Sequence, residues 1–116
     1  MRISDCGEKK EETEIVIARI WHGWTKPENA KAYEDMVRDE IFPAIVARNI
    51  KGYRGAELFI KQDPEEIEFV TLLRFDSMNA VKEFAGVDEG KPVIYSKAEA
   101  LLTRMDQRSR HYRIAI

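Results

Sequence analysis

The sequence contains one cysteine, Cys6, among 116 residues. A single thiol cannot form an intrachain disulfide, and it excludes a metal site built from several cysteines. Because Cys6 lies in a polar N-terminal stretch, we expect no catalytic role for it.

Long hydrophobic runs are also missing. No apolar stretch approaches the roughly 18 residues that a membrane-spanning helix needs. Residues 1–13 have no apolar segment of the kind found in signal peptides. The sequence therefore predicts a cytoplasmic protein that has no membrane partner.

Neither sign of charge dominates. The 19 Lys and Arg residues and 21 Asp and Glu residues give a net charge of -2 and are interspersed. This balance gives no electrostatic footprint for nucleic acid, and we expect no such partner. The local basic cluster of Arg108, Arg110 and Arg113 is more typical of a solvated strand face or a subunit contact than of a phosphate site.

Several catalytic motifs are absent. The sequence has no P-loop, G-x-G-x-x-G, nucleophile elbow or paired-carboxylate motif. Its two histidines have no third ligand at a spacing typical of a metal site. We therefore expect neither a cofactor nor a metal.

The composition indicates a single globular domain. Hydrophobic residues make up 44% of the chain and charged residues 34%, which is typical of a folded domain. Residues 1–13 are polar and without period, and predict a flexible tail. Residues 14–116 are predicted to form the domain.

The densest apolar run is Glu14–Trp24, E-I-V-I-A-R-I-W-H-G-W. Its β-branched and aromatic residues predict a central strand. Apolar residues occur at both alternating sets of positions, so both faces of this strand are expected to be covered.

The other elements follow from periodicity and turn residues. A helix is predicted to begin after a capping box at Thr25 and to kink at Pro43. Ser77 and Ser96 are predicted to cap two later helices, and Gly55 indicates a bulge. The remaining predicted elements are strands Tyr53–Gln62, Ile67–Asp76 and Asp106–Ile116, and a short helix from Ser96 to Met105.

This order predicts a ferredoxin-like β-α-β-β-α-β domain of the α+β class. Right-handed crossovers place the first and third strands at the centre. Helices cover one face of the sheet, and the other face is too apolar to remain in water. Two copies facing each other would form a homodimeric α+β barrel.

Four segments carry a resemblance to a known family: I-A-R-I-W-H-G-W-T-K-P-E-N-A, G-Y-R-G-A-E-L, E-F-V-T-L-L-R-F-D-S and the closing R-H-Y. Over about residues 14–116 the chain resembles antibiotic biosynthesis monooxygenase domains, which form dimeric α+β barrels. The resemblance implies one of several activities. These are cofactor-independent oxidation of aromatic polyketides, haem degradation, or the roles of related barrels, which include isomerases and ligand-sensing domains.

The haem-degrading branch is disfavoured by particular residues. That branch has an Asn on the first strand and a Trp and a His on the helical side of the pocket. The strand Glu14–Trp24 has no Asn, and the segment S-M-N-A-V-K-E-F-A-G has neither His nor Trp. The Trp, Tyr, Asn and Arg residues of the aromatic-oxidising branch cannot be matched one by one.

Two histidines are the candidate catalytic bases. By the resemblance, His22 and Trp24 face the helices, where the family's pocket lies. A histidine there could deprotonate an acidic phenol, because its pKa lies near neutral pH. The alternative is a hydrogen-bonded structural histidine. His111 could approach the same pocket from the last strand or could face the dimer interior.

Aromatic residues are the candidate walls for a small hydrophobic or aromatic ligand. Trp24, Phe69, Phe75 and Tyr95 are the candidates to contact it, with core packing favoured for the first three and simple packing the alternative for Tyr95. Trp21, Arg19 and Arg74 are predicted to face the dimer interior. A cofactor-independent monooxygenase-like enzyme is the first hypothesis. A non-catalytic dimeric module binding a hydrophobic metabolite, or a barrel-type isomerase, are the alternatives.

Overall fold

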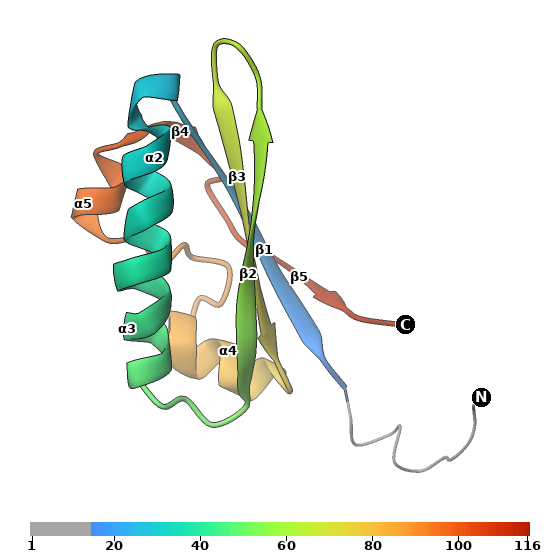
Figure 1. Ribbon diagram of the computed structural model, residues 1–116. Coiled ribbons are helices and arrows are strands. Elements are labelled where there is room, and N and C mark those ends of the chain that lie inside the picture. The colour runs from blue at the N-terminus through green and yellow to red at the C-terminus, as the bar shows by residue number, and fades with distance from the viewer. Residues whose placement is uncertain (1–14) are drawn as a thin grey trace.

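The computed structural model describes residues 15–116. The predicted tail 1–13, with Cys6, lies outside the described residues. An antiparallel sheet forms one layer, and helices pack against one of its faces (Figure 1). No helix in the described part of the chain is both long enough and apolar enough to cross a membrane.

The sheet has the predicted order. Strands run in the order β2-β3-β1-β4, and β5 also pairs with β1. This confirms that the first and third strands are central. The strands are β1 (Ile17–Thr25), β2 (Tyr53–Gln62), β3 (Ile67–Phe75), β4 (Leu102–Met105) and β5 (Arg110–Arg113).

The helical layer has an irregular turn before Pro43. The helices are α2 (Pro27–Met36), α3 (Phe42–Ala47), α4 (Met78–Ala85) and α5 (Ser96–Glu99). Between α2 and α3, the segment η1 (Val37–Ile41) is a π-helix, in which the Phe42 amide donates to the Val37 carbonyl. Pro43 has no N–H for the carbonyl four residues earlier, and the wider turn lies directly before it.

The predicted caps have mixed outcomes. Ser77 accepts a hydrogen bond from the Ala80 amide and caps α4 as predicted. The prediction for Thr25 is wrong, because Lys26 is the N-cap of α2 and Thr25 ends β1, fully buried. The prediction for Ser96 is also wrong, since Tyr95 occupies the N-cap position of α5. Burial in the sheet decided the position of Thr25 and prevented a local capping bond.

The C-terminal third corrects two predicted elements. The helix predicted from Ser96 to Met105 ends at Glu99, and Leu102–Met105 forms β4 instead. The strand predicted for Asp106–Ile116 is limited to β5. The exposed edge of β1 offers backbone hydrogen bonds to both segments, and pairing there overrides a short helical periodicity. Between them, the Asp106 carboxylate accepts from the His22 amide at 2.9 Å.

The core lies between the helices and one face of the sheet. Phe75 and Phe84 pack with ring centroids 5.6 Å apart, and Tyr33 and Phe69 do so at 4.7 Å. Phe69 and Phe75 are 1% and 0% exposed. These aromatic contacts join α2 and α4 to β3.

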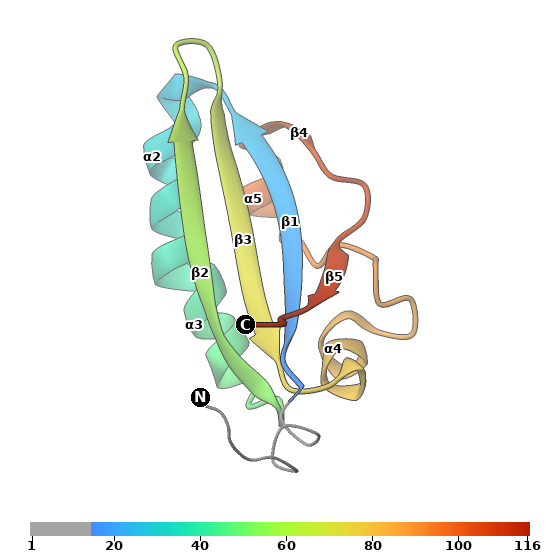
Figure 2. The same ribbon diagram turned by 90° about the vertical axis from the view of Figure 1, so that its right-hand side faces the viewer.

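The opposite face of the sheet is open in the single chain (Figure 2). Its residues alternate along β1, β2, β3 and β5, and include Phe59 and Tyr112, which are 48% and 51% exposed. The apolar and aromatic members of this open face are Ala18, Ile20, Trp24, Phe59, Val70, Leu72 and Tyr112. The prediction of two apolar faces is confirmed, and the homodimer stays a prediction.

Gly52 and Gly86 both have positive φ, but their surroundings differ. Gly52 has φ of 93°, and its carbonyl accepts from the Asp76 amide at the end of β3 at 2.8 Å. A Cβ on Gly52 would overlap the Asp76 carboxylate, whereas a Cβ on Gly86, at φ of 97°, would meet nothing within 4 Å.

We predict that Gly52→Ala lowers the free energy of unfolding more than Gly86→Ala. Backbone strain alone costs roughly 1–3 kcal/mol at either position. The overlap with Asp76 adds at least about 1 kcal/mol at Gly52, since that side chain and the loop must move. Urea unfolding of both variants measures the difference, and equal losses would contradict the close packing at Gly52.

Candidate functional site

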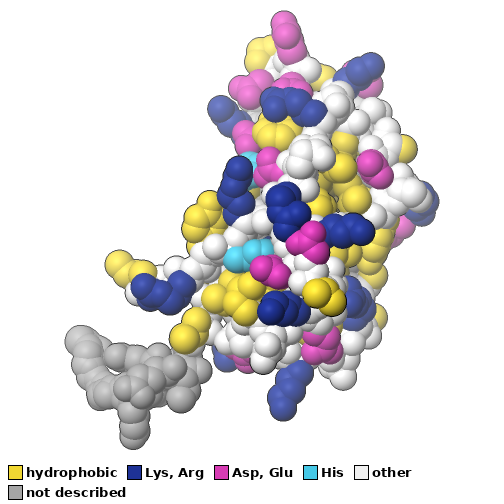
Figure 3. All heavy atoms as spheres, turned by 180° about the vertical axis from the view of Figure 1, so that it is seen from behind, with side chains coloured by type: hydrophobic (Ala, Val, Ile, Leu, Met, Phe, Trp, Pro, Cys, Tyr) yellow, Lys and Arg dark blue, Asp and Glu magenta, His cyan; other side chains and the backbone are white. Residues whose placement is uncertain are grey.

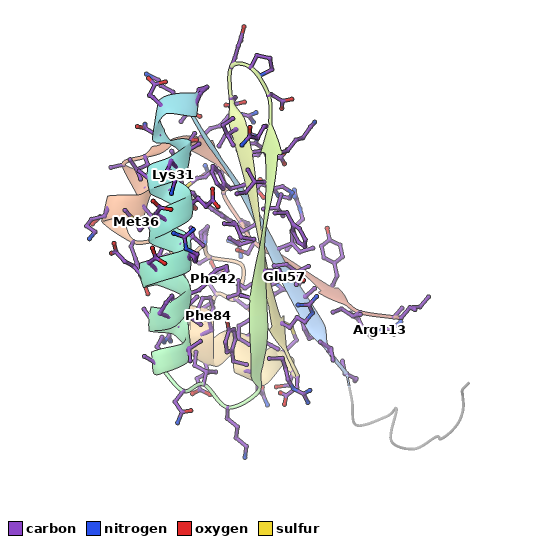
Figure 4. All side chains as sticks on the ribbon, viewed as in Figure 1. Lys31, Met36, Phe42, Glu57, Phe84 and Arg113 are labelled. Atoms are coloured by element: carbon purple, nitrogen blue, oxygen red, sulfur yellow. The ribbon has the colours of Figure 1, made fainter. Side chains whose placement is uncertain are left out.

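A cavity of about 60 Å³ lies between the sheet and the helices. Its walls come from β1, β3, the α2–α3 helical segment and the α4–α5 loop (residues 86–95). Phe42 and Phe84, which line the cavity, point into the space between helices and sheet (Figure 4). The lining residues are Arg19, Trp21, Tyr33, Val37, Ile41, Phe42, Ile45, Thr71, Leu73, Phe84, Pro92, Val93, Ile94, Tyr95, Ala98 and Ser109.

Arg19 is the one charged residue among those lining residues. It is 4% exposed. Its Nη1 donates to the Glu89 carbonyl, and its Nη2 donates to the Lys91 carbonyl at 2.8 Å. The guanidinium also lies 5.3 Å from the centre of the Phe84 ring. Arg19 therefore ties the α4–α5 loop to the central strand.

His111 contacts the same guanidinium. Arg19 Nη1 lies 2.9 Å from His111 Nε2. Burial, and then the positive charge of Arg19, lower the pKa of His111. The imidazole is therefore neutral at neutral pH, and its Nε2 can accept the Arg19 hydrogen bond. Burial also lowers the pKa of Arg19, to about 10, so the guanidinium remains protonated.

Hydroxyl groups supply the other polar lining. Tyr33, Thr71, Tyr95 and Ser109 all border the cavity. Burial raises the pKa of Tyr33 to about 12, so this phenol stays neutral and can donate a hydrogen bond. The cavity is therefore mostly apolar, with one buried cation and a few neutral donors.

The predicted facing of β1 is reversed. Arg19 and Trp21, expected in the dimer interior, face the helices and line the cavity. His22 and Trp24, expected beside the helices, lie on the open face. Because side chains alternate along a strand, assigning one residue to the wrong face of the sheet places all the other residues of the strand on the wrong face too.

A polar cluster surrounds His22 on the open face. His22 Nδ1 lies 2.7 Å from Asp106 Oδ2, and the His22 ring stacks beside Trp24 at 6.0 Å between centroids. Arg104 lies over the Trp24 ring at 3.9 Å and pairs with Glu66. His22 therefore makes the hydrogen bond expected of a structural histidine, which was the alternative to a catalytic base.

Arg74 also lies on the open face, where it was expected, but not with Trp21 and Arg19. The register pairs Arg74 with Ala18 across β1 and β3. Its guanidinium donates to the Glu57 carboxylate at 2.6 Å. Its predicted ion pair is therefore formed within one chain.

Of the predicted wall residues, Tyr95 lines the cavity, and it is 39% exposed at the mouth. Phe69 and Phe75 belong to the surrounding core and do not line the cavity. Trp24 lies on the other face of the sheet. Sequence reasoning missed Arg19, Trp21 and Ser109 as lining residues. A lone arginine within an apolar strand was the available signal for Arg19, because a buried cation needs a specific environment.

Charge elsewhere on the surface is mixed. Seen from behind, basic and acidic side chains are interspersed (Figure 3). Within residues 15–116, no group of three or more His, Cys, Asp or Glu side chains is placed to hold a metal ion.

Comparison with known proteins gives structural matches only. The sequence matches no protein-family model. No curated protein matches it either.

Three solved structures illustrate the structural match. A proposed antibiotic biosynthesis monooxygenase from Bacillus cereus is 12% identical, with a TM-score of 0.61 over 88% of this chain and 95% of that chain. One from Nitrosomonas europaea is 11% identical, with a TM-score of 0.58 over 86% and 90% of the two chains. A Mycobacterium tuberculosis protein is 24% identical, with a TM-score of 0.52 over 87% and 94%.

Identities below 25% show the fold and not the activity. The chain has the α+β fold of antibiotic biosynthesis monooxygenase-like proteins.

Proposed function

We propose that this protein is a cofactor-independent monooxygenase-like enzyme that oxidises a small aromatic or polyketide-like substrate in the cavity between sheet and helices. The observation that carries the proposal is the cavity itself, an apolar enclosure bordered by Arg19, Tyr33 and Tyr95. Ligand sites are typically apolar with a few placed polar groups.

The chemistry requires a base and molecular oxygen. Deprotonation of an anthrone gives an electron-rich carbanion, which reduces O₂; the ring CH₂ becomes C=O, and water is the second product. His111 is assigned as the base, because its ring is neutral and contacts the cavity-lining Arg19. Nε2 of His111 becomes free to take the proton when Nη1 of Arg19 releases it.

The cavity must widen to admit such a substrate. Its volume is about 60 Å³, whereas a cavity that holds benzene measures about 150 Å³. The α4–α5 loop is the wall without regular secondary structure. It is held by Arg19, by the Arg108–Asp88 ion pair and by the Ser109 amide, which donates to the Gly90 carbonyl. Outward movement of this loop would open the cavity.

A non-catalytic module that binds a hydrophobic metabolite is the second candidate. The observation that favours it is that neither histidine lines the cavity. In that case the cavity would bind the same class of ligand without oxidising it.

We also propose that the protein is a homodimer formed through the open face. The apolar residues of that face would be covered by a second copy. The C-terminal segment 114–116 projects outward from the same face (Figures 1 and 2). Ile116 at its end is fully exposed, and could pack on a partner.

One prediction of this proposal concerns catalysis. With dithranol or another anthrone under air and without added flavin or metal, the protein should consume O₂ and form the quinone. His111→Ala should lower the rate at least about 100-fold, because general bases contribute roughly 10²–10⁴-fold. An oxygen electrode and quinone absorbance measure both.

His22→Ala is the matched control and should retain most of the rate, because His22 lies on the other face of the sheet. Equal rates in wild type and His111→Ala would contradict the assigned base. Ligand binding without O₂ consumption would favour the non-catalytic module.

Another prediction concerns assembly. The wild type should sediment as a dimer, and Phe59→Glu should weaken it at least about tenfold, since a buried, unpaired carboxylate is costly. Val46→Glu is the control, because Val46 is 62% exposed on α3, away from the open face. Analytical ultracentrifugation measures both; a monomeric wild type would contradict the homodimer.

A further inference from the structure

Among the described residues, no carboxylate forms an ion pair with the buried guanidinium of Arg19. Within residues 15–116, its hydrogen-bond partners are two backbone carbonyls and a neutral imidazole. None of the lining residues of the cavity is acidic. Removing a cation from water without a counter-ion is costly, and neutral dipoles offset only part of that cost.

The Arg19 contacts leave donors unused. A guanidinium carries five N–H groups. Both hydrogens on Nη1 and one on Nη2 are directed to the Glu89 carbonyl, His111 Nε2 and the Lys91 carbonyl. In the described part of the chain, Nε and the second Nη2 hydrogen have no hydrogen-bond partner. Arginine N–H groups on adjacent nitrogens bind planar oxyanions with two hydrogen bonds.

The rest of the lining fits the body of an aromatic anion. Trp21, Phe42 and Phe84 provide flat apolar surface. Tyr33 is held neutral by burial and can add a hydroxyl donor. An apolar enclosure strengthens the attraction between the guanidinium and an anion, because water no longer screens it.

We propose that the cavity selects a ligand bearing one negative charge, an aromatic carboxylate, phenolate or enolate, whose oxygen binds Arg19. This inference rests on the proposed function, whose substrate class it narrows. A neutral ligand of the same shape would leave the buried cation uncompensated and would bind more weakly. Arg19 would then determine specificity as well as hold the α4–α5 loop.

Benzoate and benzamide test the charge requirement, because they match in size and differ in charge. The two tryptophans provide the readout: the Trp21 indole borders the cavity, and the Trp24 indole lies on the opposite face. Titrations followed by ¹H–¹⁵N NMR, with the indole signals assigned from Trp24→Phe, should show benzoate shifting the Trp21 signal. Benzoate should bind at least about tenfold more tightly than benzamide.

Variants then locate the charge. Arg19→Gln should reduce the preference for benzoate to less than about twofold, and Arg19→Lys should retain part of it. Arg74→Gln is the matched control, since it removes a charge from the open face, and it should keep the full preference. If Arg19→Gln does not fold, the comparison of benzoate and benzamide in the wild type still tests the charge requirement. A reduced preference for benzoate in Arg19→Lys then tests the role of Arg19.

The outcomes separate the two proposals. Equal affinity for benzoate and benzamide at Trp21 would overturn the charge requirement and leave the apolar cavity of the proposed function in place. An unchanged preference in Arg19→Gln would overturn the role of Arg19. If neither compound shifts the Trp21 signal at tens of millimolar, the cavity does not admit aromatic ligands and both proposals fail.

Discussion

One buried guanidinium connects the parts of the molecule that enclose the cavity. Arg19 extends from the central strand, holds the α4–α5 loop through two backbone carbonyls and contacts His111 on β5. The Arg19 side chain is 4% exposed and lies beside the Phe84 ring. Because a buried cation needs hydrogen-bond partners, these neutral acceptors must stay in position. The cavity, its cover and its electrostatic character therefore depend on the same side chain. A ligand anion would bind the N–H groups of Arg19 that the loop carbonyls leave unused, so the ligand and the α4–α5 loop would be held by the same side chain.

The sheet separates two different environments on the two faces of β1. Arg19 and Trp21 face the enclosed cavity. His22 and Trp24 face the open side, where His22 is bound by Asp106 and Trp24 is covered by Arg104. Alternation along a strand places neighbours in sequence on opposite sides of a layer. Two aromatic and two basic residues close together on one strand can thus have unrelated roles, one set at the cavity and the other on the proposed subunit interface.

Much of the fold could be predicted because its signals are local. The Ser77 cap and the β-branched residues of the strands mark the order of elements, and right-handed crossovers then give the sheet order. The C-terminal third was less predictable. Leu102–Met105 has a helical spacing of apolar residues, yet it pairs with β1. A four-residue pattern is weak compared with the backbone hydrogen bonds that an unpaired strand edge offers. The bend at Asp106 depends on its contact with His22, which is distant in sequence.

The sequence alone determined the α+β class, the central position of the first and third strands, and the presence of apolar residues on both faces of the sheet. These follow from periodicity, which each segment carries within itself. Only the tertiary structure decided which face of β1 meets the helices, and thereby that Arg19 and Trp21, rather than His22 and Trp24, border the cavity. Because both faces of β1 carry apolar residues, the alternating pattern does not show which set of side chains faces the helices. The difference between the faces arises from the helices and the α4–α5 loop, which pack against one face only.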